Sequence, residues 1–139
     1  MDALIFNGST YIGDEVFSTT GVGQTCALDV VLGKTATYHV KVYNDGNMTQ
    51  PIQIIGTAGN SKWAVQYVDY STSADITASV TGAGWQTQSV KPGAYWRGRV
   101  LVTPNASVTV GAGLSLLLKG TSAVDTSKKD AVKMTTTRR

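Results

Sequence analysis

The stretch TATYHVKVY at residues 35–43 decides the fold of this chain. Apolar side chains at Tyr38, Val40 and Val42 alternate with polar ones, so that they share one face of an extended segment. The stretch therefore predicts a half-buried β-strand. It is followed by NDGN at residues 44–47, whose residue types tolerate positive φ or fold back on their own backbone, which predicts a turn.

The same period of two recurs along the rest of the chain. No stretch shows the apolar spacing of an amphipathic helix, and 15 glycines are scattered through the sequence, so we expect minimal helix content. Turn residues such as KPG at 91–93 and TPN at 103–105 separate the extended segments. The predicted strands are 24–31, 35–43, 52–54, 63–69, 76–80, 85–90, 95–102 and 114–118, with 3–6 and 129–136 as edge strands.

These strands favour two packed antiparallel sheets. A single sheet would leave one face of Tyr38, Trp63, Val100 and Leu116 uncovered, whereas two sheets about 10 Å apart bury both inner faces. A length of 139 residues fits one domain. Within residues 1–139 we expect an N-terminal strand and long loop at 1–23 and a C-terminal strand and basic tail at 123–139.

The composition excludes most catalytic and metal-binding arrangements. The single cysteine, Cys26, forms no disulfide within the chain, and the single histidine, His39, has no partner for a His/Cys metal cluster. We predict that His39 is an exposed strand residue and that Cys26 is buried and inert. The oxygen-rich pairs and runs at 14–15 and 44–47 lack the spacing of a known calcium site. No enzyme activity, cofactor or metal is predicted.

The positive charge is unevenly distributed. The net charge is +3, but residues 1–127 carry 7 basic and 8 acidic side chains, while residues 128–139 carry 5 basic side chains and 1 acidic one. A nearly neutral body gives no broad surface for a polyanion, so no nucleic-acid partner is predicted. The longest apolar stretch, 108–118, is interrupted by polar residues and glycine and is too short for a membrane span.

Several turn and strand motifs resemble a known group of modules. They are GK at 33–34 before the strand predicted at 35–43, VKPG at 90–93 before a strand that ends in VTP at 102–104, and GAGLSLLLKGTS at 111–122. DALIF at 2–6 and YIGDEVF at 11–17 are similar to the start of such a module. Together they resemble the immunoglobulin-like repeat modules, of the NEW3 and CARDB-like kind, of large bacterial and archaeal cell-surface proteins.

The resemblance implies an immunoglobulin-like Greek-key sandwich of seven to nine strands without an active site. It implies a spacer, adhesion or assembly role at an extracellular or cell-surface location, with identical subunits or adjacent modules as partners. Three residues depart from the pattern: Gly98 stands where a branched apolar residue is usual, and Cys26 and Trp96 are additional. They indicate either a local bulge or a local contact surface.

Two sets of residues are candidates for a binding site. Strand edges pair readily with other chains, so the terminal segments are predicted to contact neighbouring copies or modules, as in a self-assembling filament; their residues are Ala3, Leu4, Ile5, Phe6, Val132, Lys133, Met134 and Thr135. The alternative is a carbohydrate-binding module. In that case the aromatic rings of Trp85, Tyr95 and Trp96 would stack on sugars.

Overall fold

The computed structural model describes all 139 residues and is a β-sandwich with one short helix. Its elements are β1 (Asp2–Phe6), β2 (Tyr11–Ile12), β3 (Thr25–Val30), β4 (Ala36–Tyr43), β5 (Ile52–Gly56), β6 (Trp63–Asp69), α1 (Thr77–Val80), β7 (Trp85–Gln86), β8 (Tyr95–Pro104), β9 (Gly113–Ser122) and β10 (Lys129–Arg138). The predicted all-β sandwich is confirmed. No helix in it is long enough to cross a membrane.

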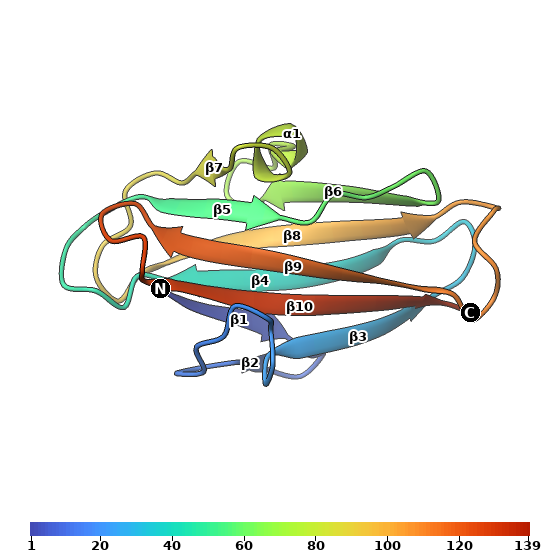
Figure 1. Ribbon diagram of the computed structural model, residues 1–139, viewed down its shortest axis with the longest axis horizontal. Coiled ribbons are helices and arrows are strands. Elements are labelled where there is room, and N and C mark those ends of the chain that lie inside the picture. Colours follow the sequence, from blue (N-terminus) through green and yellow to red (C-terminus); the bar gives the residue numbers. More distant parts are fainter.

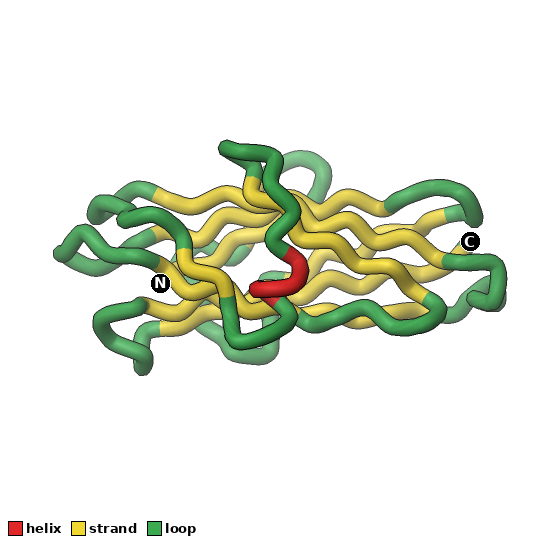
Figure 2. The backbone as a smooth tube through the Cα atoms, turned by 90° about the horizontal axis from the view of Figure 1, so that it is seen from above, coloured by secondary structure: helices red, strands yellow, loops and turns green.

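The strands form two five-stranded sheets that lie face to face along the long axis of the molecule (Figure 1 and Figure 2). Sheet A has the order β2-β1-β4-β8-β6, and sheet B has the order β3-β10-β9-β5-β7. Most consecutive strands lie in opposite sheets. Two features differ from the prediction: the two-residue strand β2 was not predicted, and β3 pairs with β10 in parallel.

The predicted inward faces form the core. Tyr38, Val40 and Val42 of β4 are almost fully buried, and Leu116 and Leu118 of β9 face them from sheet B. Strand β8 alternates between half-buried and buried positions from Trp96 onward. Burying an aliphatic or aromatic side chain of this size contributes about 1.5–3 kcal/mol, so these two faces supply most of the stabilisation.

The segment 76–80 is predicted as a strand, and this is wrong because residues 77–80 form helix α1. Ile76 and Val80 are both buried, and their spacing of four satisfies a strand period as well as a helical one. The Asp75 carboxylate accepts hydrogen bonds from the N–H and the hydroxyl of Thr77, at 3.0 and 2.6 Å, which fixes the turn into the helix.

The predicted strand 85–90 is also shorter than expected, since β7 ends at Gln86. The next residue, Thr87, uses its side-chain oxygen to accept the N–H of Ile52 at 2.9 Å. The N–H of Ile52 thus bonds to a side chain instead of to a backbone carbonyl, and the regular pairing of β5 with β7 ends here. Beyond this point Gln50 and Val90 pair only as an isolated bridge.

The terminal segments are not the sheet edges that the sequence predicted. Strand β1 lies between β2 and β4, and β10 lies between β3 and β9. Ala3, Ile5, Val132 and Met134 are fully buried in the single chain. The error has a physical reason: alternation shows which residues face inward, but it does not show which strands become neighbours. Strand β10 extends to Arg138, so most of the predicted basic tail is part of sheet B.

The departure at Gly98 is explained by its neighbour Trp96. Pairing runs without a bulge through Gly98 on both sides, to Val40 of β4 and Asp69 of β6. A Cβ atom at position 98 would overlap the indole ring of Trp96. Gly98 therefore leaves the space that the large side chain of Trp96 fills.

We predict that Gly98→Ala destabilises the chain by about 1–3 kcal/mol, because the added methyl group overpacks the indole. Urea unfolding measures the change. In a Trp96→Leu background the same substitution should cost clearly less, since the ring is absent. An equal cost in both backgrounds would contradict this explanation.

Candidate functional site

The three aromatic residues that the sequence predicted for ligand stacking line one groove. The groove has a volume of about 570 Å³ and lies between β7 and the start of β8. Trp85 and Trp96 have ring centroids 5.9 Å apart. Tyr95 is 45% exposed, Trp85 is half-buried and Trp96 is only 7% exposed. Trp96 therefore forms part of the core, and Tyr95 is the most exposed of the three rings although it packs against Tyr43.

Asp69 holds the Trp96 indole in this groove. Its Oδ1 accepts the indole N–H at 2.8 Å, and its Oδ2 accepts the hydroxyls of Ser71 and Thr72 at 2.9 and 2.6 Å. Burial alone would raise the pKa of Asp69, but the hydrogen bonds from Thr72, Trp96 and Ser71 outweigh it and lower this pKa. The carboxylate is therefore ionised and positions the ring.

The outer face of sheet A carries a group of basic side chains, which we call the cationic face: His39 and Lys41 of β4, and Arg97 and Arg99 of β8. Lys41 lies directly opposite Arg97 in the register, and His39 lies opposite Arg99. All four are half-buried. The sequence predicted that these residues face outward but not that they lie side by side.

Aromatic rings surround the cationic face. The Lys41 ammonium lies 4.2 Å from the ring centroid of Tyr11 and 4.5 Å from that of Tyr95. The Arg97 guanidinium lies 3.7 Å from the ring centroid of Tyr70. At these distances the ring quadrupoles attract the cations and hold them in place.

The single histidine, His39, and the single cysteine, Cys26, lie in different parts of the sandwich. His39 is half-buried rather than exposed, and burial together with the charges of Arg97 and Arg99 lowers its pKa. Cys26 is buried in the core, as predicted, and burial raises the pKa of its thiol. Both shifts favour the neutral form.

The two oxygen-rich segments that the sequence showed separately meet in one acidic groove of about 700 Å³. It is lined by Asp2, Asp14, Glu15 and Asp45, among others. No three side chains of the acidic, His or Cys type are placed to hold a metal ion. The groove lies at one end of the outer face of sheet A, beside Tyr11 and Tyr43.

A buried carboxylate beneath this groove joins the two sheets, and sequence reasoning missed it. Asp130 of β10 is fully buried. Its oxygens accept the N–H groups of Ala3 in sheet A at 2.7 Å and of Ser18 at 2.8 Å, together with the side-chain amide of Gln24. Burial raises the pKa of Asp130 despite these bonds. The only signal in the sequence was a single acidic residue directly before the apolar pair Ala131 and Val132.

Asp2 lies close to Asp130 and is also buried, at 6% exposure. Burial, and after it the charges of Asp130 and Asp14, raise the pKa of Asp2 to about 6, against a hydrogen bond from the N–H of Glu15 that lowers it. One carboxylate oxygen of Asp2 has no hydrogen-bond partner. The ionised form of Asp2 is therefore disfavoured in the folded chain.

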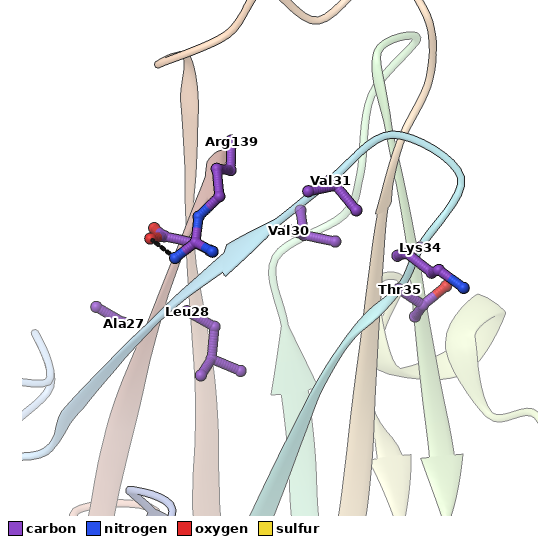
Figure 3. Close-up of a pocket in the computed structure, with 8 residues that line it drawn as sticks. Ala27, Leu28, Val30, Val31, Lys34, Thr35 and Arg139 are labelled. Atoms are coloured by element: carbon purple, nitrogen blue, oxygen red, sulfur yellow. Dashed lines mark hydrogen bonds and ion pairs between the residues drawn. The ribbon is translucent and has the colours of Figure 1, made fainter.

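A further pocket of about 400 Å³ lies where β3 turns toward β4 (Figure 3). Leu28, Val30 and Val31 line it, and Arg139 forms an ion pair with Asp29 at 3.3 Å on its rim. These residues lie at one end of the sandwich, beside edge strand β3. Of the predicted subunit-contact residues, those of β10 pair with β3 from its inner side and those of β1 lie in the other sheet. Their contact role stays a prediction.

The comparisons with known proteins give fold similarity only. No family model matches the chain, and no curated protein matches it. It is similar to part of a family 123 glycoside hydrolase from Clostridium perfringens, with 4% identity and a TM-score of 0.48, over 83% of this chain and 23% of that one. It is also similar to the YadV chaperone, with 10% identity and a TM-score of 0.43, over 99% of this chain and 52% of that one. The chain thus spans about a quarter and about half of the lengths of these two proteins.

We predict that Asp2 makes the stability of the chain fall as the pH rises. Its folded pKa of about 6 exceeds the ordinary value of 3.8, so its stabilising contribution is complete below pH 3.8 and is lost as the pH rises through about 6. Urea unfolding of the wild type and of Asp2→Asn between these pH values and above measures it. The variant should lose stability less steeply, and parallel curves for the two proteins would contradict the prediction.

Proposed function

We propose that the chain is a non-enzymatic β-sandwich module that spaces and joins neighbouring modules, or identical copies, in an extracellular surface protein or filament. One observation supports this most: the two chain ends lie toward opposite ends of the long axis (Figure 1). Copies joined through their ends would therefore continue along that axis. Figure 2 shows the same separation from above.

The anchoring of the terminal strands also supports a spacer. Strand β10 is hydrogen-bonded on both sides, to β3 and β9, along most of its length. Strand β1 pairs with β4 and β2, and its Ala3 N–H is held by Asp130 of the other sheet. Because the strands run along the long axis, tension between the ends would load many ladder hydrogen bonds at once rather than one after another.

The proposed location rests on the resemblance of the turn motifs to those of cell-surface modules. Contact between modules would use the ends and edge strand β3, which is paired on one side only, with β10. An edge strand presents unpaired backbone groups to which another chain can add.

We predict that two copies joined directly form an extended rod. Strands of ten residues span about 33 Å, so each copy adds at least that length along the axis. Small-angle X-ray scattering should give a maximum dimension close to twice that of one copy. A control with a long Gly/Ser linker should give a broader distribution of distances. A compact particle from the direct fusion would contradict the proposal.

A carbohydrate-binding module is the second candidate, and the groove that brings Trp85, Tyr95 and Trp96 together favours it. Polar side chains from Thr72, Gln88 and Ser89 also line this groove. Aromatic rings beside hydrogen-bonding groups suit a neutral sugar.

If this candidate is right, Tyr95→Ala should weaken binding of a neutral polysaccharide by about 1 kcal/mol, since it removes the most exposed ring. Titration of the tryptophan fluorescence measures the affinity, because Trp85 and Trp96 line the same groove. Tyr70→Ala is the matched control: Tyr70 is 44% exposed, close to the 45% of Tyr95, but does not line the groove. Equal losses in both variants, or no change in fluorescence for the wild type, would argue against sugar binding here.

A further inference from the structure

The cationic face combines like charges without any acidic partner. Lys41 and Arg97 are directly opposite each other on neighbouring strands, and Arg99 follows on the same face of β8. Like charges in directly opposite positions destabilise a sheet. The two ion pairs of the structure involve Asp45 and Asp29, and neither includes a residue of the cationic face.

The guanidinium groups also have unused hydrogen-bonding capacity. The Nε atoms of Arg97 and Arg99 are both shielded from solvent, and neither has an acceptor. Buried donors in folded proteins are nearly always paired, so two unpaired donors on adjacent outward positions of one strand call for an explanation. An anion bound beside these two guanidinium groups would relieve the repulsion between them and Lys41.

The neighbouring rings fix the cations before any ligand arrives. Tyr70 lies against Arg97, and Tyr11 and Tyr95 both lie against Lys41. Charged side chains held in this way lose less conformational freedom on binding than free ones. The face is therefore preorganised for anionic groups.

We propose that the cationic face binds an acidic polysaccharide, whose carboxylate or sulfate groups meet Arg97 and Arg99 while Lys41 contacts a third acidic group. A guanidinium binds such groups through two parallel N–H bonds. Side chains two positions apart on a strand are separated by about 7 Å, so the two arginines engage successive acidic groups of one polymer. The hydroxyls of the sugar face Thr37, which is exposed on the same side of the sheet.

The arrangement favours a polysaccharide over a nucleic acid. Proteins that bind single-stranded nucleic acid stack the bases on free aromatic rings, whereas here a cation already lies against Tyr11 and another against Tyr70. The acidic groove around Asp14 and Glu15 borders the cationic face at one end and limits the length of positive surface. This inference does not depend on the spacer role, because it concerns the side of the sandwich and not its ends.

The test uses the full chain with polygalacturonate as the acidic probe and dextran as the neutral one, by isothermal titration at low and at moderate ionic strength. We expect binding of polygalacturonate only, weaker at the higher salt concentration because salt screens surface charges. Arg97→Gln/Arg99→Gln should weaken it by about tenfold or more, since both bidentate contacts are lost. The matched control, Lys128→Gln/Lys129→Gln, removes the same charge from exposed residues outside the cationic face and should change the affinity less than about twofold.

The Arg97→Lys/Arg99→Lys variant keeps the charge and covers the case in which the glutamine variant fails to fold. It should bind several-fold more weakly than the wild type, because an ammonium group cannot form the two parallel bonds. Four results would overturn the proposal: no binding of polygalacturonate by the wild type, equal binding of dextran, an equal loss in the Lys128/Lys129 control, or clearly tighter binding of oligothymidylate.

Discussion

The mutual burial of two apolar sheet faces is the constraint on which the rest of the structure depends. Each sheet alone would expose one side of its large residues to water, and together they exclude it. The sheets come close enough only because small residues stand where they approach most tightly. At Gly120 of β9, a Cβ atom would lie 2.5 Å from a methyl carbon of Val42 in the opposite sheet. At Gly56 it would meet the ring of Tyr67.

Apolar burial is not directional, so polar contacts between the sheets select one alignment among many. The Tyr38 hydroxyl of sheet A donates to the carbonyl of Thr135 in sheet B at 2.7 Å, and the Tyr67 hydroxyl donates to the carbonyl of Thr57 at 2.6 Å. Asp130 makes the corresponding contact from sheet B to Ala3. Each of these groups would be costly to bury without its partner, so a shifted alignment would lose all three.

On the outer face of sheet A the charged groups are not paired with groups of opposite charge. In the interior the Tyr38, Tyr67 and Asp130 groups that join the sheets are each paired, whereas on this outer face the basic groups face one another and the acidic groups gather at one end. The core therefore explains stability, and the uneven outer face is where binding is to be sought. The Trp85 and Tyr95 groove occupies a third region, at the margin between the sheets.

The sequence by itself determined the strand content, the inward faces and the turns, because alternation and turn chemistry are local properties. It identified Tyr38, Val40 and Val42 as core, and it placed Arg97 and Arg99 on the outer side of their strand. The prediction for residues 76–80 was wrong because a spacing of four between Ile76 and Val80 fits the period of a strand and that of a helix equally well.

Only the tertiary structure decided which strands are neighbours. The neighbouring strands in turn bring together the residues of each candidate site. The pairing of Lys41 with Arg97 and the hydrogen bond from Ala3 to Asp130 join residues far apart in the chain. The contact of Trp85 with Trp96 joins strands of different sheets. Strand pairing depends on how all the faces pack together, which no single segment encodes. For the same reason the terminal strands lie inside the sheets, since the packing of the whole sandwich gave them partners on both sides.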